Sequence, residues 1–494
     1  MRTRPFFFAA PTSLVLAIFL AAAALGQGTY QAQVRGVVSD QSGAVVGNAT
    51  VTITENGTNL STTAKTGSDG YYILRGLRPS SYSVKAEAPG FQTFQKQNVV
   101  LAVDQQTTLD FSLKPAGMST QIQVEAAAPL LDTESASLGT DVTNEYVKQI
   151  PLLDRNFFGL MFLSAGVTEV TGAGTADNYP TGTNFVSNGQ RNATAEVRID
   201  GALVSAPEQG EGATSNVYYE PSVEIVQEFK VQNNSYSAEF GSNGGTVVNM
   251  VLKSGTNNFH GSAWWFGQRG WLDANEFFTK QAGQPRAGHT RDQYGISLGG
   301  PIIKNKTFFF VDIERINAKA PQPINATVPT ALERSGDFRQ TNILDPDGNV
   351  VPNLIFNPYQ LSGGQRADFS TPNVIDPQFI DPIGQKIINL YPLPNVPGDP
   401  GIGTNNFRTV VTNASRSLQF DIKVDHQLAP QHRISGRYSR SHATNNIPTV
   451  FGNDDTGPSG DGIASLTNVQ NTALEWNWTV KPTVLLSSRF GVDR

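Results

Sequence analysis

The side chains that could carry chemistry are few and scattered along the chain. His426 and His432 flank a short predicted turn, and "DPDGN" at 345–349 and "GNDDTGPSGDG" at 452–462 have the Asp and Gly content of calcium loops. The chain has no cysteine or suitably spaced third ligand for zinc, and neither loop has the glutamate of a calcium hand. We therefore interpret these residues as ordinary turns, with a metal pair at His426 and His432 as the alternative. The five histidines are His260, His289, His426, His432 and His442.

The composition excludes several classes of protein. The sequence contains no GxGxxG, phosphate-loop or GxSxG motif, so we expect neither enzymatic activity nor a cofactor. A net charge of −6 gives no sign of a nucleic-acid partner. The absence of cysteine excludes a lipoprotein anchor and a disulfide-stabilised scaffold.

The first 26 residues have the pattern of a secretory signal peptide. Arg2 and Arg4 supply the positive start, an apolar run follows from Leu14 to Leu25, and Gly26 ends a small-x-small cleavage site. No later run reaches the about 18 apolar residues that a spanning helix needs. If the mature protein lies in a membrane, it must cross without helices.

Residues 30–115 are predicted to form a small β-sandwich. "ATVTIT" and "YSVKAEA" alternate apolar and polar side chains, and turn clusters separate the strands. The segment resembles the carboxypeptidase regulatory-like domain, a transthyretin-like sandwich. Because it contains no His and no Cys, it lacks the usual ligands of a zinc site. The matching residues are Gly36, Val38, Asp40, Gly43, Ala44, Gly47, Ala49, Asp69, Gly70, Tyr71, Tyr72, Pro89, Gly90 and Phe91.

Residues 119–255 are predicted to form an α+β unit that ends with the strand "GGTVVNMVLKSG". Thr143 and Asp154 are expected to cap two helices. The second helix should contain Phe157, Leu160 and Leu163, which recur at helical spacing. Val247, Met250 and Leu252 of the last strand are expected to pack in a soluble core.

Residues 256–494 are predicted to form an antiparallel transmembrane sheet of seven strands. Leu418, Phe420, Ile422 and Val424 share one face of a strand, while Gln419, Asp421, Lys423 and Asp425 share the other. The connections alternate between long (269–290, 317–416, 443–469) and short, as in a meander with tight turns on one side of a bilayer. The seven segments are 259–268, 291–301, 305–316, 417–426, 432–442, 470–480 and 483–493.

An odd number of strands cannot form the usual bacterial barrel. Such barrels use an even number and close on themselves, because unpaired strand edges are prohibitive in lipid. We therefore expect the barrel to be incomplete and the sequence to be the N-terminal fragment of a longer protein.

The order of these parts resembles TonB-dependent outer-membrane receptors of the Oar-like type. The resemblance implies a mainly β fold with a signal peptide (1–26), a periplasmic sandwich (30–115), a plug (119–255) and an outer-membrane barrel (256–494). It implies uptake of a scarce solute with energy from the inner-membrane TonB complex. The motifs are "VEAAAPLLDTESASLGT" (124–140), "QIPLLDRNFFGLMFLSAGV" (149–167), "NGQRNATAEVRIDGA" (188–202), "EFGSNGGTVVNMVLKSGTNNFHGSAW" (239–264) and "DQYGISLGGPIIKNKTFFFVDIE" (292–314).

Such receptors contact TonB through a short extended segment ahead of the plug, which adds a strand to a partner sheet. The candidate here shows strand alternation and lies at that position. The alternative is that the same residues form the first strand of the plug. The candidate residues are Thr120, Gln121, Ile122, Gln123, Val124, Glu125 and Ala126.

The transported ligand cannot be read from the residues. We expect a large solute such as an oligosaccharide, a peptide or a chelate, contacted by loops 170–190, 203–218 and 317–416. Two alternatives are a barrel-anchored adhesion or structural protein and a secreted soluble carbohydrate-binding β protein.

The aromatic residues of the barrel strands are expected to form a girdle at the membrane interface, with a buried core stripe as the alternative. They are Trp264, Trp265, Trp271, Phe308, Phe309, Phe310, Trp476 and Trp478.

Overall fold

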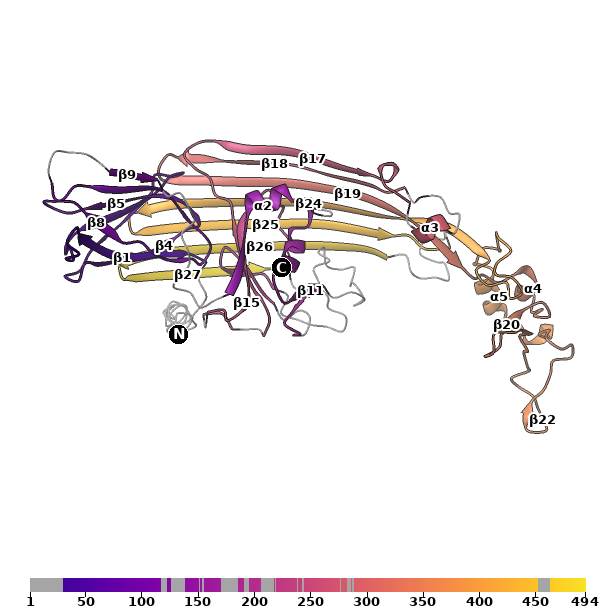
Figure 1. Cartoon of the computed structure of the whole chain (residues 1–494). Coiled ribbons are helices and arrows are strands. Elements are labelled where there is room, and N and C mark those ends of the chain that lie inside the picture. Colours follow the sequence, from indigo (N-terminus) through magenta and orange to yellow (C-terminus); the bar gives the residue numbers. More distant parts are fainter. Residues whose placement is uncertain are drawn as a thin grey trace, which may run out of the picture.

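The protein has three parts: a two-sheet sandwich, an α+β plug and a sheet of seven long strands (Figure 1). The predicted mainly β fold class is confirmed. None of the helices in the described ranges combines the length and apolar composition needed to cross a bilayer. The computed structural model describes residues 30–116, 122–125, 138–150, 152, 155–169, 185–190, 195–205, 217, 219–237, 239–241, 244–275, 277–281, 286, 288–451 and 463–494. The predicted signal peptide lies outside these ranges.

The sandwich packs a sheet of order β4-β1-β7, with β8 also on β1, against a sheet of order β3-β2-β5-β6-β9. Alternate residues of β2 and β5 point inward, so Val51, Ile53 and Val84 are buried. The strands are β1 (Ala32–Asp40), β2 (Thr50–Glu55), β3 (Ser61–Lys65), β4 (Tyr71–Leu77), β5 (Ser80–Glu87), β6 (Phe94–Leu101), β7 (Gln106–Thr108), β8 (Phe111–Leu113) and β9 (Ile122–Glu125).

The plug is built on a five-stranded sheet of order β10-β15-β16-β13-β14. All residues of β16 are buried, as expected for a central strand covered on both faces, and Val247, Met250 and Leu252 lie inside as predicted. The elements are β10 (Leu138–Thr143), α2 (Asn144–Gln149), η2 (Phe157–Leu163), β11 (Val167–Glu169), β12 (Phe185–Ser187), β13 (Glu196–Ile199), β14 (Ala202–Leu203), β15 (Val226–Asn234) and β16 (Val247–Leu252).

Only the first of the two predicted plug helices is an α-helix. Thr143 caps α2 as expected, by accepting a hydrogen bond from the Tyr146 N–H. The second element is the 3-10 helix η2, in which Asn156 is the cap, and Asp154 lies outside the described residues. Leu160 of η2 is buried, but Leu163, its last residue, is 59% exposed, so the expected packing of Leu163 is wrong.

All seven predicted barrel segments are strands of one antiparallel sheet, paired in chain order. The sheet is not closed, and β17 and β27 form its two edges. Short turns lie at the end that carries the sandwich, and long connections lie at the opposite end (Figure 1). The strands are β17 (His260–Arg269), β18 (Thr290–Ile303), β19 (Thr307–Ala326), β24 (Phe407–Ala429), β25 (His432–Ile447), β26 (Ile463–Lys481) and β27 (Val484–Asp493).

These strands bury charged side chains and expose apolar ones, which is the reverse of the pattern in a soluble protein. On β24, Asp421 and Lys423 are buried against the plug and Asp425 is buried beside Arg78 of the sandwich, whereas Leu418 is exposed. A sheet that hides its charges and exposes its apolar side chains is suited to lipid on the outer face and to a polar lumen. Other outward apolar side chains are Ile296, Leu298, Ile313, Leu474, Leu486 and Phe490.

The aromatic residues divide between the two faces. Trp265 is 64% exposed and Trp476 is also exposed, as a girdle requires. The prediction is wrong for Phe308 and Phe310, which are fully buried on the inward face. Neighbouring residues of a strand point to opposite faces, so a run of three aromatics cannot lie wholly in lipid.

The connection from β19 to β24 forms a projecting arm at the long-loop end (Figure 1). It spans 327–406, shorter than the predicted 317–416, because both strands continue as a ribbon past their neighbours. Pro321 and Pro323 lie on this ribbon beyond the last β18 pair, and the missing N–H groups protect its free edge from further pairing. The smaller elements are η3 (Gly270–Leu272) and α3 (Phe277–Gln281) before β18, and α4 (Ala331–Arg334), β20 (Asn342–Leu344), β21 (Val350–Pro352), β22 (Leu361–Ser362), β23 (Gln365–Arg366), η4 (Pro377–Phe379) and α5 (Pro382–Ile388) in the arm.

Candidate functional site

The plug is held against the barrel wall by a buried ionic group at the turn between β13 and β14. Asp200 and Gly201 both have positive φ, 50° and 78°, as the central residues of a tight hairpin turn require. The turn presents Asp200 to the wall, where Lys423 Nζ lies 2.7 Å from Oδ1 and Arg437 Nε lies 3.4 Å from Oδ2. Lys423 also donates to the Leu252 carbonyl oxygen at 3.0 Å. One lysine of the wall therefore binds two strands of the plug.

A second group of contacts joins the plug segment 219–224 to carboxylates of the wall. The Tyr219 hydroxyl donates to Asp421 at 2.6 Å, and the Ser222 hydroxyl donates to Asp312 at 2.7 Å. Arg155 pairs with Glu224 at 3.0 Å within the plug. Buried polar groups are costly unless they are paired, so these contacts fix the plug in one position in the lumen.

The sandwich reaches the barrel through Arg78, which lies just after β4. Its guanidinium is 3.2 Å from Glu55 of the sandwich, 3.0 Å from Asp425 of β24 and 3.0 Å from the Ser254 hydroxyl. Burial favours the neutral form of Glu55, but the charge of Arg78 holds the pKa of this carboxyl below its usual value. We refer to Glu55, Arg78, Asp425 and Ser254 as the latch.

Two further contacts attach the sandwich to the short-turn end of the barrel. The Tyr30 hydroxyl donates to Glu475 of β26 at 2.6 Å, and Arg489 of β27 pairs with Glu475 at 2.8 Å. On the other side, the Asn257 backbone N–H donates to the Gly57 carbonyl oxygen at 2.8 Å. The Asn257 side chain donates to Asn305 in the β18–β19 turn at 2.6 Å. The sandwich therefore spans from β17 to β27.

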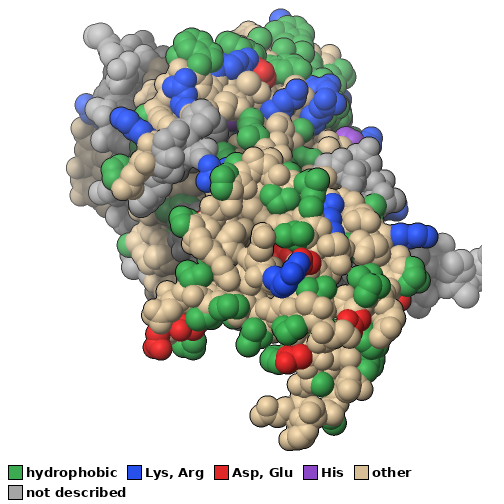
Figure 2. Space-filling model, turned by 90° about the vertical axis from the view of Figure 1, so that its right-hand side faces the viewer, with side chains coloured by type: hydrophobic (Ala, Val, Ile, Leu, Met, Phe, Trp, Pro, Cys, Tyr) green, Lys and Arg blue, Asp and Glu red, His purple; other side chains and the backbone are tan. Residues whose placement is uncertain are grey.

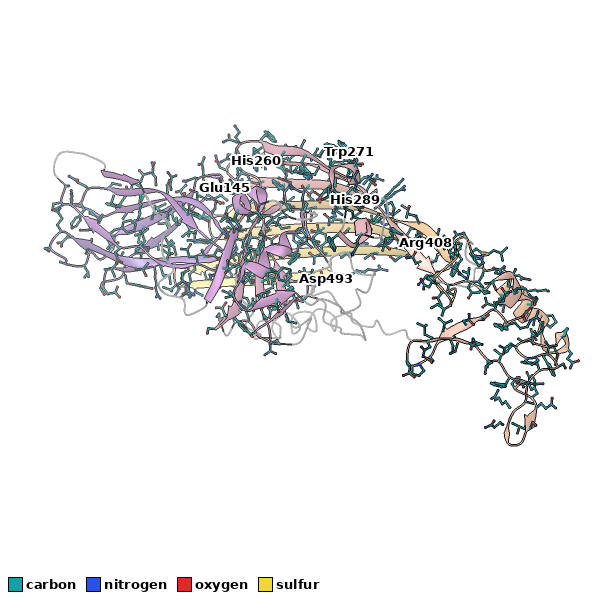
Figure 3. All side chains as sticks on the ribbon, turned by 45° about the vertical axis from the view of Figure 1, so that its right-hand side comes forward. Glu145, His260, Trp271, His289, Arg408 and Asp493 are labelled. Carbon is teal, nitrogen blue, oxygen red and sulfur yellow. The ribbon has the colours of Figure 1, made fainter. Side chains whose placement is uncertain are left out.

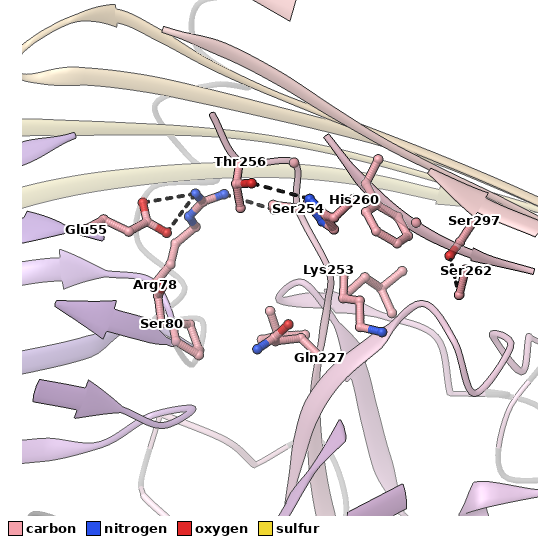
Figure 4. A pocket seen from close by; sticks show the side chains of 16 residues that line it. Glu55, Arg78, Ser80, Gln227, Lys253, Ser254, Thr256, His260, Ser262 and Ser297 are labelled. Atoms are coloured by element: carbon pink, nitrogen blue, oxygen red, sulfur yellow. Dashed lines mark hydrogen bonds and ion pairs between the residues drawn. The ribbon is translucent and has the colours of Figure 1, made fainter. Parts of the chain in front are cut away.

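A cavity of about 370 Å³ lies where the three parts meet (Figure 4). The sandwich contributes Glu55 and Arg78 to its wall, and the end of the plug contributes Lys253. The barrel contributes Ser297 and Phe310, and much of the lining is hydroxyl-bearing. The cavity lies between the sandwich and the lumen at the short-turn end, and the latch residues Glu55, Arg78 and Ser254 line it.

The candidate TonB-contact segment lies on the sandwich. Ile122–Glu125 form β9, which pairs in parallel with β6 from Phe94↔Ile122 to Gln97↔Glu125. This strand belongs to the sheet of the sandwich and not to the sheet of the plug, and within the described residues it is an edge strand. Thr120, Gln121 and Ala126 lie outside the described residues.

The other residues singled out by the sequence do not converge. His260 lies near the short-turn end and His289 near the far end of the β17–β18 hairpin, beside Trp271 (Figure 3). Among the described residues no three His, Asp or Glu side chains are placed to hold a metal ion. Asp345 accepts hydrogen bonds from Asp347 and Asn349 within its own turn, which agrees with the interpretation of 345–349 as an ordinary turn. The loop 452–462 and most of the predicted ligand loops 170–190 and 203–218 lie outside the described residues.

Two plug carboxyls titrate near neutral pH. Burial raises the pKa of Glu228 to about 7, against the effect of the Val103 N–H of the sandwich, which donates to it. Burial and the neighbouring Glu314 carboxylate raise the pKa of Glu220 to about 8. Both carboxyls are therefore partly protonated at the pH at which most bacteria grow.

The ionic contacts could not be identified from the sequence as partners. Asp421, Lys423 and Asp425 were recognisable as one polar face of a strand, and this alternation was the available signal. Arg78 and Glu55 carried no comparable signal, because a single charged residue at the end of a soluble strand is ordinary.

Comparisons with known proteins match the sandwich and the barrel sheet to two described families. Residues 251–494 match the family described as outer membrane beta barrel domain, and residues 33–114 match the carboxypeptidase regulatory-like domain. The TonB-dependent transporter Oar of Myxococcus xanthus is 27% identical over 286 residues, which are 56% of this chain and 25% of that protein. The chain thus spans about a quarter of the length of this curated relative.

Two solved structures show weaker similarity. The siderophore receptor PiuA of Acinetobacter baumannii aligns with 72% of this chain and 45% of its own, at 10% identity and a TM-score of 0.34. A catechol 1,2-dioxygenase of Acinetobacter radioresistens aligns with 20% of this chain and 58% of its own, at 14% identity and a TM-score of 0.16. Similarity this low carries no argument about activity.

Proposed function

We propose that the chain is an Oar-like TonB-dependent receptor of the bacterial outer membrane and that it takes part in energy-dependent uptake of a large, scarce solute. The solute is an oligosaccharide, a peptide or a chelate. The inner-membrane TonB complex supplies the energy from the periplasmic side, where the sandwich lies. The barrel wall contacts outer-membrane lipid.

The observation that carries this proposal is the plugged, charged lumen. The inward face of the wall is covered by a separately folded unit that is held by Asp200, Lys423 and Arg437. A solute cannot pass until the plug moves, and that movement separates these buried pairs and exposes part of the apolar core that the plug shares with Phe310 and Val469 of the wall. Such a device suits a transporter that is driven by an external energy source and does not suit a passive pore.

The segment Thr120–Ala126 is proposed as the contact with TonB. Its described part, β9, is extended and is an edge strand within the described residues, as strand addition requires. We expect the soluble periplasmic domain of TonB to bind full-length protein in outer membranes and to lose binding when residues 119–126 are deleted. Deletion of eight residues of the external arm, 359–366, is the matched control and should leave binding unchanged.

Binding by the unaltered protein tests the transport function, and binding by the deletion variant tests the assignment of the segment. Absence of binding by the unaltered protein would contradict TonB-dependent transport. Normal binding by the 119–126 deletion would place the contact elsewhere and would remove only the assignment of the segment.

The external arm favours a second candidate function, barrel-anchored adhesion. Figure 2, which views the end that carries the arm, shows apolar side chains spread over a surface with few charges. Tyr359, Leu361 and Ile383 of the arm are among its most exposed side chains. An ordered arm with exposed apolar groups could bind another surface, and it could equally contact the transported solute.

A further inference from the structure

The contact between the sandwich and the rest of the protein is polar. Among the described residues, the apolar core of the sandwich is composed of its own residues, from Ala32 to Leu113. The core of the plug, by contrast, includes Phe310 and Val469 of the barrel wall. The described contacts of the sandwich with the other parts are mainly ion pairs and hydrogen bonds, together with a small cluster of Tyr30, Val103 and Val251 and the approach of Leu485 to Gly76.

This difference determines what separation would cost. Moving the plug exposes part of a shared apolar core, whereas moving the sandwich leaves its own core intact. When the sandwich separates from the barrel, the polar groups of the latch and of the turn contacts mainly lose each other as partners and bind water instead. Buried ion pairs contribute little net stability relative to their hydrated components, so an interface of this kind can open reversibly.

The position of the sandwich determines what separation would achieve. Its contacts run from Asn257 before β17, through Asn305 in the β18–β19 turn and Asp425 of β24, to Glu475 of β26 and Thr483 in the β26–β27 turn, so it lies across the short-turn end of the sheet. The cavity beside the latch lies between the sandwich and the lumen (Figure 4). A solute that passed the plug would meet the sandwich next.

We propose that the sandwich is a periplasmic gate, which the latch holds across the mouth of the barrel and which must undock before a solute can leave the lumen. This inference rests on the proposed transport function. A pulling force that TonB applies to the segment Thr120–Ala126 would reach the sandwich directly, because β9 is hydrogen-bonded to β6 of the sandwich. A pull on this segment therefore acts on the sandwich before it reaches the plug.

The latch can be tested without a known solute, because the chain contains no cysteine. Thr256 lines the cavity beside the latch, and Thr256→Cys supplies a single reporter at the docking interface. In outer membranes containing full-length protein, we measure the rate at which N-ethylmaleimide labels it. Asp425→Asn weakens the latch from the barrel side and Arg78→Gln from the sandwich side, so a folding defect in one variant leaves the other informative.

Both latch variants are expected to speed labelling by roughly tenfold or more, as loss of a charge-assisted hydrogen bond predicts. Lys85→Gln is the matched control, because it removes a cation of the sandwich that pairs only at its surface, with Glu87. It should leave the rate unchanged. Equal labelling in the latch variants and the control would overturn the gate.

A second reporter separates this inference from the transport function. Ala202→Cys lies between the plug and β27, where a Cβ on Gly491 would be 3.4 Å from the Ala202 Cβ. In energised cells the gate predicts faster labelling of Thr256→Cys than after addition of a protonophore. Energy-driven labelling at Ala202→Cys but not at Thr256→Cys would overturn the gate and leave transport standing. If energy affects neither reporter while the latch variants still differ from Lys85→Gln, the TonB-coupled function fails and the docked closure stands.

Discussion

Replacing Lys423 with Met is expected to lower the free energy of unfolding of the plug in the barrel by about 3 kcal/mol. The Lys423 side chain is only 2% exposed and pairs with Asp200 at 2.7 Å. Removing the cation leaves a buried carboxylate that keeps Arg437 at 3.4 Å and the Leu252 N–H at 3.2 Å. These partners are the reason to expect the lower end of the usual range of about 3–5 kcal/mol.

The measurement is urea unfolding of full-length protein in detergent, followed with a dye attached at Leu203→Cys, an exposed residue of the plug. With an m value of about 1–3 kcal/mol/M, the midpoint should fall by about 1–3 M. Lys319→Met is the control, because Lys319 lies in the same sheet and is exposed. It should change stability by no more than about 0.5 kcal/mol. Equal midpoints for both variants would contradict the ionic attachment of the plug.

Replacing Gly255 with Ala is expected to prevent correct assembly at the point where the chain passes from plug to barrel. A Cβ at this residue would lie 2.3 Å from the Phe309 carbonyl oxygen and 2.5 Å from the Gly300 carbonyl oxygen. Both obstacles are backbone atoms of paired strands and cannot rotate away. The cost should therefore reach or exceed the about 1–3 kcal/mol typical of overpacking.

This effect is measured as the amount of folded, heat-modifiable protein in outer membranes. A loss of about 1–2 kcal/mol of folding stability already reduces the abundance of a protein several-fold. Gly288→Ala is the matched control, because a Cβ there meets no atom within 4 Å. If Gly255→Ala accumulated like Gly288→Ala, the close approach of the chain to β18 and β19 at this residue would be refuted.

The parts of the fold that follow from local periodicity were predictable. Alternation on β24 separates Leu418 and Ile422 from Asp421 and Lys423, and the structure places the first pair outward and the second pair inward. The alternation of long and short connections also identified which ends of the strands carry the turns. Two-residue periodicity applied to Phe308, Phe309 and Phe310 would have divided that aromatic run correctly between lumen and lipid.

The contacts that join the parts were not predictable, because they depend on residues far apart in the chain. Arg78 and Asp425 meet only because the sandwich docks on the barrel, and nothing near either residue in the sequence indicates the other. The same holds for the parallel pairing of β9 with β6, since β9 alternates equally well as a strand of the plug. The 3-10 form of η2 was missed because three apolar residues at spacing three fit both kinds of helix.

Energy-dependent uptake is tested most directly by measuring how much of a labelled probe accumulates in cells that express the full-length protein. The probes are an oligosaccharide, a peptide mixture and a ferric chelate, each compared in cells with and without functional TonB. We predict that at least one probe accumulates and that loss of TonB reduces its accumulation to that of cells lacking the protein. Accumulation that is the same with and without TonB, together with loss of surface attachment when the protein is removed, would contradict transport and support adhesion.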